Sequence, residues 1–188
     1  MNNKCDSREK ILQAATRLFN IQGYHATGIN QILKESDAPK GSLYYHFPNG
    51  KEQLAVEGVN QMATIVASDI QASLSNAPLV EGIQNHIKSI AQHFDNTQQL
   101  VGIPIGLLAA ETALKSEPLR NACLTAFEAW EKVYFDHIMK NGYEIEEAKR
   151  LSLAIISIIE GGITRSLLNK NGHPLQQIAH CIPSLLKK

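Results

Sequence analysis

The chain is poor in the features that mark several large classes of protein. Aromatic residues make up 6% of its 188 residues, and 18 Lys and Arg side chains are matched by 18 Asp and Glu, so its net charge is zero. Balanced charge excludes a protein that holds nucleic acid or membranes through overall basicity. A content of 44% hydrophobic and 19% charged residues is that of a folded globular protein and excludes a disordered one.

Cysteines and long apolar runs are also scarce. The three cysteines, Cys5, Cys123 and Cys181, lie far apart without a CxxC motif. This spacing argues against a disulfide framework and favours free thiols in a reducing compartment. The most apolar run, residues 151–159, is too short to cross a bilayer, and the polar start MNNKCDSREK has no secretory signal pattern. We therefore expect a cytoplasmic protein without a membrane segment.

Motifs of catalysis are missing as well. The sequence contains no G-x-S-x-G, H-E-x-x-H, P-loop or G-x-G-x-x-G pattern. His86 and His93 are seven residues apart and can share a helix face, but no nearby cysteine or carboxylate pattern completes a set of metal ligands. We expect no catalytic site, no cofactor and no metal.

What the chain does have is helical periodicity. Strand-like alternation is absent, and several of the seven prolines separate segments whose apolar residues recur at helical spacing. We predict an all-α fold of about nine helices: an N-terminal three-helix domain and a larger C-terminal helical bundle. The expected helices cover residues 7–22, 28–35, 39–46, 51–74, 80–94, 107–115, 117–141, 144–169 and 174–186.

The first 50 residues have the spacing of a helix-turn-helix. A three-residue turn, residues 36–38, separates the second and third short helices. Thr27 suits the N-cap of the second helix, and Pro39 suits the first turn of the third. Residues 1–55 carry seven basic and five acidic side chains, a small excess of the sign that DNA binding favours. We predict a DNA-binding domain at 1–50 and a ligand-binding and dimerisation domain at 51–188, joined rigidly through a helix.

The stretch APKGSLYYHFPNGKEQL, residues 38–54, places an unusual set of side chains on one short helix. Leu43 and Phe47 are four residues apart and share its inward face. A helix that reads the DNA major groove needs small residues for close approach, and polar and aromatic side chains for phosphates, base edges and thymine methyl groups. The outward and flanking positions supply such a set: Lys40, Gly41, Ser42, Tyr44, Tyr45 and His46.

These motifs resemble those of a known family. Residues 10–55, KILQAATRLFNIQGYHATGINQILKESDAPKGSLYYHFPNGKEQLA, are similar to the N-terminal domain of the TetR family of bacterial transcriptional repressors. Residues 104–133, PIGLLAAETALKSEPLRNACLTAFEAWEKV, resemble the C-terminal domain of the LmrA/YxaF branch. The resemblance implies that Thr27 and Lys51 contact phosphates at the starts of the second and fourth helices, and that the outward residues above form the recognition surface. Gly28 stands where many relatives carry a second hydroxyl residue.

The larger domain combines aromatic and aliphatic side chains with a few polar ones, as a site for a small hydrophobic or aromatic effector requires. The alternative is that the aromatic residues, at three- and four-residue spacing, are simply core. Glu111 and Glu160 interrupt apolar helices, so each must lie at a rim, bind a ligand hydroxyl or pair with Arg120 or Arg165. The candidate ligand-binding residues are Phe94, Leu107, Leu108, Glu111, Phe127, Trp130, Tyr134 and Ile159.

The last two expected helices, 144–169 and 174–186, suit a dimer interface. Gly161-Gly162 permits close approach of a neighbouring helix, and residues 174–186 are amphipathic. The alternative is that both helices cover the core of their own chain. Together these features predict a ligand-responsive homodimeric repressor of a palindromic DNA operator, and not an enzyme. An effector-independent activator or architectural protein, or a small helical enzyme that uses the C-terminal cavity, are the alternatives.

Overall fold

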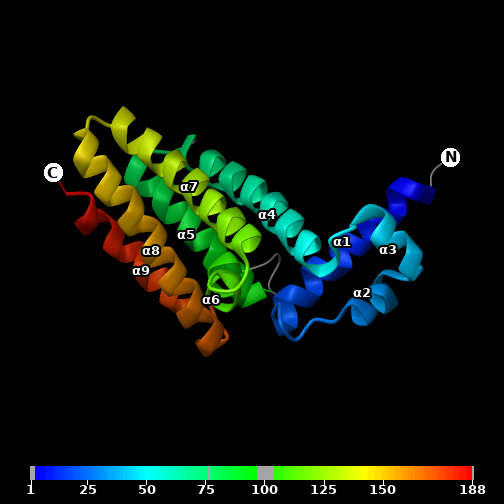
Figure 1. The fold of residues 1–188 in the computed structure, drawn as a ribbon. Helices are drawn as coiled ribbons and strands as arrows, with labels where there is room; N and C mark the ends of the chain where they lie inside the picture. Colours follow the sequence, from blue (N-terminus) through cyan, green and yellow to red (C-terminus); the bar gives the residue numbers. More distant parts are fainter. Residues whose placement is uncertain (1–2, 76, 97–103, 188) are drawn as a thin grey trace. The chain divides into compact units, whose positions relative to one another are not determined.

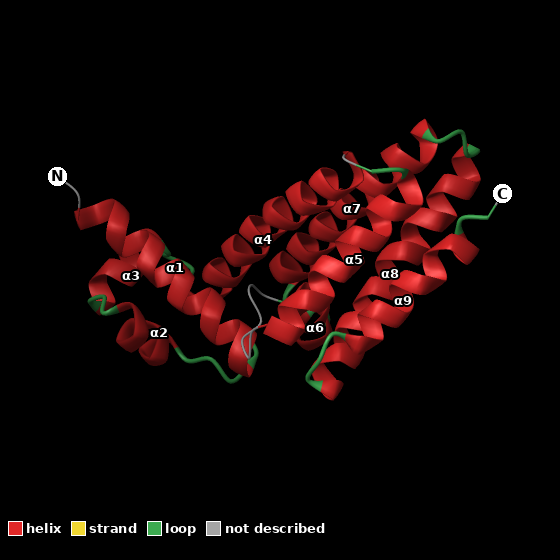
Figure 2. Ribbon diagram, turned by 180° about the vertical axis from the view of Figure 1, so that it is seen from behind, coloured by secondary structure: helices red, strands yellow, loops and turns green. Residues whose placement is uncertain are grey.

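The structure, a computed structural model, describes residues 3–75, 77–96 and 104–187, with the backbone alone for residues 3–6. Every regular element in this part of the chain is a helix (Figures 1 and 2), so the predicted all-α fold is confirmed. The helices are α1 (Asn3–Gln22), α2 (Ile29–Ser36), α3 (Lys40–His46), α4 (Gly50–Ser75), α5 (Leu79–Asn96), α6 (Ile105–Thr112), α7 (Glu117–Lys140), α8 (Ile145–Asn169) and α9 (His173–Leu185).

The chain forms two compact units, and each is built from two stretches of sequence. Unit 1 comprises residues 1–62 and 100–126, and unit 2 comprises residues 63–99 and 127–188. The long helix α4 therefore contributes its first half to unit 1 and its second half to unit 2. The division differs from the predicted functional boundary after residue 50, because α6 and the start of α7 also belong to unit 1.

Unit 1 is organised around α1, which packs against both α2 and α3. Its inward face follows the predicted periodicity, with Ile11, Ala15 and Phe19 buried. Leu43 and Phe47 of the α3 segment are fully buried, as their four-residue spacing predicts. Arg8 lies over the Phe47 ring, 5.0 Å from its centroid, and pairs with Glu57 of α4. This core fixes the face of α3 that points inward and thereby the face that points outward.

The turn between α2 and α3 is as tight as predicted. Helix α2 ends at Ser36, and Asp37 adopts the left-handed conformation, with φ of 50°. Pro39 caps α3 with an extended backbone. One detail differs from the prediction: α2 is capped by Gly28, not Thr27, and the Gln31 carboxamide oxygen accepts from the Gly28 N–H at 2.8 Å.

Unit 2 is a bundle in which α9 lies along both α5 and α8 (Figure 1). Helices α8 and α9 approach each other closely at Gly162, where a β-carbon would lie 2.6 Å from side-chain atoms of Leu175 and Ile178. A glycine here is therefore explained within one chain. Gly161, by contrast, faces open space within the described residues.

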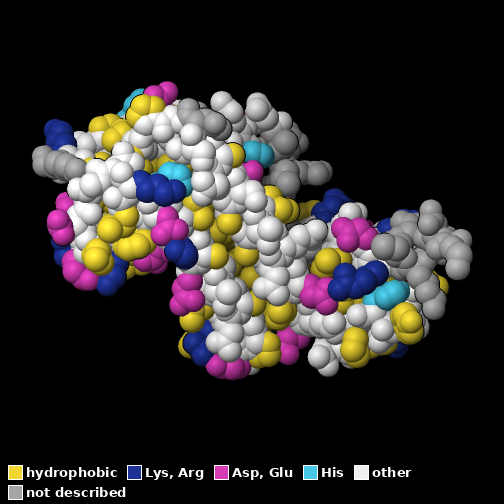
Figure 3. Space-filling view, turned by 90° about the horizontal axis from the view of Figure 1, so that it is seen from above, with side chains coloured by type: hydrophobic (Ala, Val, Ile, Leu, Met, Phe, Trp, Pro, Cys, Tyr) yellow, Lys and Arg dark blue, Asp and Glu magenta, His cyan; other side chains and the backbone are white. Residues whose placement is uncertain are grey.

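Helix α8 is long and apolar enough to cross a membrane by length and composition. In unit 2 it packs against α9 and α5 instead, with Ile155, Ile159 and Gly162 buried. On the face seen in Figure 3, Lys and Arg side chains are interspersed with Asp and Glu among the described residues, in keeping with the balanced charge of the chain.

Candidate nucleic-acid interface and effector site

The outward face of α3 carries the side chains predicted to read DNA. Tyr44 and Tyr45 are 46% and 68% exposed, although burial of large apolar side chains would be favourable. Lys40 and Gly41 are exposed, and Ser42 and His46 are half-buried. The structure thus brings all six predicted recognition residues onto one seven-residue helix whose opposite face is core.

At Gly41 the outward face of α3 carries no side chain, so another molecule can come close to the helix backbone there. A β-carbon at Gly41 would meet nothing within 4 Å, so glycine is not required by packing inside the chain. The Tyr45 ring stacks edge-on against His46, with centroids 4.9 Å apart. Tyr44 lies beside Gly50 at the start of α4, since a β-carbon at Gly50 would lie 3.7 Å from its ring. Both tyrosine rings therefore have neighbours within their own chain.

Thr27 and Lys51, the two predicted phosphate contacts, are engaged inside unit 1. The Thr27 side chain is 1% exposed, and its hydroxyl donates to the Gly23 carbonyl at 2.8 Å. The Lys51 ammonium donates to the carbonyls of Tyr24 and Thr27, each at 3.0 Å. Burial lowers the pKa of Lys51, and the Glu111 carboxylate acts in the opposite direction. Both side chains hold the α1–α2 loop, and a phosphate contact by either stays a prediction.

A polar cluster that the sequence did not indicate surrounds the start of α2. The Gln22 carboxamide donates to the Ala26 carbonyl and to Gln31 Oε1, both at 3.0 Å, and to the Thr27 hydroxyl at 3.3 Å. The partners of Gln22 lie four to nine residues further along the chain, across a loop whose path the sequence does not fix.

The candidate effector residues are divided between the two compact units. Leu107, Leu108 and Glu111 lie in unit 1, whereas Phe94, Phe127, Trp130, Tyr134 and Ile159 lie in unit 2. All eight residues were predicted to lie in the larger domain. Because α6 belongs to unit 1, they fall into two groups.

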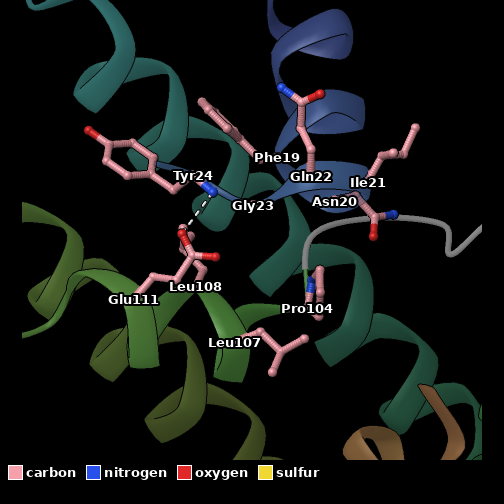
Figure 4. Close-up of a pocket in the computed structure, with 10 residues that line it drawn as sticks. All are labelled: Phe19, Asn20, Ile21, Gln22, Gly23, Tyr24, Pro104, Leu107, Leu108 and Glu111. Atoms are coloured by element: carbon pink, nitrogen blue, oxygen red, sulfur yellow. Dashed lines mark hydrogen bonds between the residues drawn. The ribbon is translucent and has the colours of Figure 1, made fainter. Parts of the chain in front are cut away.

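The unit 1 members line a hollow of about 270 Å³ (Figure 4). Leu107 and Pro104 lie on one side of the hollow, and the last turn of α1 lies on the other (Figure 4). Arg120, one of the two arginines expected to pair with a buried glutamate, pairs with Glu117 and not with Glu111. The Glu111 carboxylate instead accepts from the backbone N–H groups of Tyr24 and His25, at 2.9 and 3.2 Å.

The unit 2 members are mainly core. Tyr134, Trp130 and Ile159 are buried, and Phe94 and Phe127 are half-buried. The Trp130 indole N–H donates to the Ala63 carbonyl at 2.9 Å, and the Phe127 ring stacks edge-on against the indole with centroids 5.2 Å apart. These contacts favour the alternative that the aromatic stripe is core, with Phe127 as the member that has a partly accessible surface.

Burial shifts the pKa of a histidine and of a glutamate in unit 2. A hydrogen bond of 2.6 Å joins the Tyr134 hydroxyl to His86 Nδ1, and burial lowers the pKa of His86 to about 4. Burial also raises the pKa of the Glu160 carboxyl to about 7. His93 bonds to the carbonyl of Ser89 four residues before it. Among the described residues no group of three His, Cys, Asp or Glu side chains is arranged to hold a metal ion.

Comparison with known proteins places this geometry in a family context. Residues 11–57 match the family described as bacterial regulatory proteins, tetR family. Residues 79–181 match the transcriptional regulator LmrA/YxaF-like C-terminal domain.

Two relatives from Bacillus subtilis (strain 168) are similar along the whole chain. The HTH-type transcriptional regulator YxaF is 56% identical over 100% of this chain and 99% of its own length. The HTH-type transcriptional regulator LmrA is 53% identical over 97% of this chain and 98% of its own length.

Solved structures agree on the fold. A TetR transcriptional regulator from Legionella pneumophila is 25% identical, with a TM-score of 0.82 over 100% of this chain and 98% of that one. A TetR transcriptional regulator from Chloroflexus aurantiacus is 23% identical, with a TM-score of 0.83 over 98% of this chain and 96% of that one.

Proposed function

Because the chain belongs to the TetR family of helix-turn-helix transcriptional regulators, with an LmrA/YxaF-like C-terminal domain, we propose that it is a dimeric, cytoplasmic repressor. It reads one half of a palindromic operator with each subunit and is released by a small hydrophobic or aromatic effector. The observation that carries the proposal is the outward face of α3, where two exposed tyrosines stand beside a lysine and a glycine.

The α3 face suits the major groove by size and chemistry. Gly41 lets the first turn of the helix approach the bases, and Lys40 supplies a cation for a phosphate or a guanine edge. The phenol rings of Tyr44 and Tyr45 pack on sugars or thymine methyl groups and keep a hydroxyl for phosphate oxygens. In a two-fold dimer, two such helices reach half-sites about 34–36 Å apart, one turn of the duplex.

Helix α8 supports the proposed dimer. Its side chains Leu153, Ile158 and Leu168 are exposed large apolar residues on a surface helix of unit 2. Gly161 on the same helix has open space around its α-carbon within the described residues. A second copy of α8 and α9 would cover these side chains and form a four-helix bundle with the first.

Selection of duplexes from a random DNA pool by the wild-type protein tests the DNA-binding proposal and supplies an operator. Lys40→Ala should weaken binding of the selected duplex about tenfold and reduce the slope of log affinity against log salt by about one, because one phosphate or base contact is lost. Lys140→Ala, on an exposed position of α7 in unit 2, is the matched control and should change neither. Selection without any enriched sequence would contradict the proposal.

The effector site is tested through the single tryptophan of the chain. A planar aromatic compound that binds beside Phe127 should change Trp130 emission, since the two rings are in contact, and Phe127→Ala should weaken that response. The same compound must release the selected duplex. To shift the protein from almost wholly DNA-binding to almost wholly released, about 99:1 to 1:99, the compound must bind the released state more tightly by about 5.5 kcal/mol. A compound that binds without releasing DNA would favour the effector-independent alternative, and its chemical turnover would favour the enzyme alternative.

A further inference from the structure

Two charged side chains meet the loop between α1 and α2 from different elements of unit 1. Lys51, in the first turn of α4, donates to the carbonyl oxygens of Tyr24 and Thr27, each at 3.0 Å. Glu111, near the end of α6, accepts from the N–H groups of Tyr24 and His25, at 2.9 and 3.2 Å. Figure 4 shows the Glu111 carboxylate directed at the Tyr24 nitrogen.

One peptide group stands between the two charges. The carbonyl of Tyr24 and the N–H of His25 belong to the same peptide bond, so the cation lies at its oxygen and the anion at its hydrogen. Its dipole therefore points in the favourable direction for both charges. Each charge polarises the peptide in the sense that strengthens the bond to the other charge.

We propose that Lys51 and Glu111 act together as an ion pair bridged by the Tyr24–His25 peptide, and that this bridge positions the helix-turn-helix for DNA. The second half of the proposal rests on the proposed function. Because the loop leads directly into α2, and a three-residue turn joins α2 to α3, a fixed loop sets where α3 presents its tyrosines. Lys51 and Glu111 are positioning residues in this scheme, since each acts on α3 through its contacts with the loop.

Neighbouring contacts keep both charges in place. The Lys51 ammonium lies 4.3 Å from the centroid of the Tyr24 ring, within range of a cation–π attraction. The His25 ring donates from Nε2 to the main-chain oxygen of Glu111 at 3.1 Å. Ser116, just beyond α6, donates its hydroxyl to Glu52 at 2.7 Å, so the same region is tied to α4 next to Lys51. These bonds reduce the conformational freedom that the bridge would otherwise have to remove.

A bridge through an oriented dipole differs from a direct ion pair in one testable respect. A direct pair is symmetric, so exchanging its two residues restores the attraction. Exchange across the peptide places a carboxylate against the carbonyl of Tyr24 and an ammonium against the N–H of His25, and both contacts become repulsive. The exposed pair Lys132–Asp136 in unit 2, with its atoms 2.9 Å apart, is a direct pair in the same chain and serves as the matched control.

The experiment compares Lys51→Met, Glu111→Gln, their combination, and the exchange Lys51→Glu with Glu111→Lys. Affinity for the selected duplex and backbone amide exchange of Tyr24 and His25 are measured for each. We expect each single variant to weaken DNA binding about tenfold and to speed exchange at both amides, because a bond to a charged group is lost. The combined variant should be little worse than either single one, and the exchanged variant should show no recovery. Lys132→Asp with Asp136→Lys should match the wild type.

Three results would overturn the bridge: additive effects of the two single variants, recovery in the exchanged variant, or unchanged amide exchange at His25 in Glu111→Gln. Glu111 is exposed, so Glu111→Gln is expected to fold even if Lys51→Met does not, and it decides the question alone through the amide measurement. If the wild type binds no duplex, the proposed function fails while the amide measurement still judges the bridge. If the amides respond but DNA affinity does not, the bridge exists and its positioning role is wrong.

Discussion

Gly23 shows at the scale of one residue how closely the α1–α2 loop fits its neighbours. Its φ is 81°, in the left-handed region, where the backbone N–H bonds to the Phe19 carbonyl and ends α1. A β-carbon on this residue would lie 2.4 Å from Glu111 Oε1. A glycine in the left-handed conformation is a common way for a helix to end, but the carboxylate beside it comes from a residue 88 positions later and had no local signal in the sequence.

Gly23→Ala should destabilise the protein by about 1–3 kcal/mol, because alanine in the left-handed region is strained and its methyl group displaces the Glu111 carboxylate. Urea unfolding followed by circular dichroism measures the loss. Amide exchange at Tyr24 and His25 should rise in the same variant, since the displaced carboxylate no longer accepts from them. Unchanged stability would mean that the loop relaxes freely around Glu111.

Gly41→Ala is the opposite case, and it separates folding from DNA binding. Nothing lies within 4 Å of the position that its β-carbon would take, and alanine is favoured over glycine in a helix by up to about 1 kcal/mol. Stability should therefore stay level or rise in urea unfolding. Affinity for the selected duplex should fall, since the added methyl group stands on the proposed DNA face. Equal loss of stability and affinity would place Gly41 in the core instead.

At the scale of elements, the α8 glycine pair divides into two positions with different surroundings. Gly162→Ala puts its methyl group into the buried Leu175 and should cost about 1–3 kcal/mol through overpacking. Gly161→Ala meets no atom of its own chain, so it should not destabilise the subunit. If α8 meets its copy there, Gly161→Ala should instead weaken the dimer, which sedimentation at a series of protein concentrations measures. A dimer unaffected by Gly161→Ala would place the interface elsewhere.

The helices themselves were largely predictable, because prolines, glycines and the 3.6-residue period are local signals. Helices α7, α8 and α9 begin and end within about two residues of their predicted limits. Helix α6 begins two residues before its predicted start at 107 and ends three residues before its predicted end at 115. At the start of α4, Gln53 Oε1 accepts from the Asn49 N–H at 3.1 Å, and Glu52 accepts from the Ser116 hydroxyl.

The outward face of α3 was predictable for the same reason: two buried positions four residues apart fix the direction of all the others. The loop contacts were not. Tyr24 and Glu111 are 87 positions apart, and no periodicity of either helix says that α6 belongs with the N-terminal helices. For the same reason the sequence did not predict that the candidate ligand residues divide between two units: Leu107 and Trp130 share a sequence region but not a compact unit.

At the scale of the whole molecule, the shifted pKa values of His86 and Glu160 give the stability of unit 2 two pH dependences of opposite sign. The ordinary pKa of histidine, 6.5, falls to about 4 at His86, so between these values the unfolded chain takes up a proton that the folded chain refuses. Acid therefore destabilises through His86. The ordinary pKa of a glutamate, 4.5, rises to about 7 at Glu160, so between pH 7 and 4.5 the folded chain takes up the proton and acid stabilises.

The two effects overlap between pH 4.5 and 6.5 and should nearly cancel there. Glu160→Gln should leave only the effect of His86, so the free energy of unfolding should fall by up to about 3 kcal/mol as the pH is lowered from 6.5 towards 4. His86→Gln should expose the opposite slope, with stability rising from pH 7 towards 4.5. Urea midpoints across this range measure both. Identical profiles for the wild type and both variants would show that neither group titrates differently on unfolding.

The two compact units have a consequence for how such a protein can be recombined. Each unit is made from two separate stretches, so the polypeptide passes from one to the other three times and no single cut releases either whole. A chimera that fuses residues 1–62 to the C-terminal domain of another regulator keeps the recognition helix but lacks α6, and with it Glu111. The second regulator must then supply its own carboxylate to the α1–α2 loop. Compatibility at this one loop is therefore the condition for exchanging DNA-binding domains between regulators.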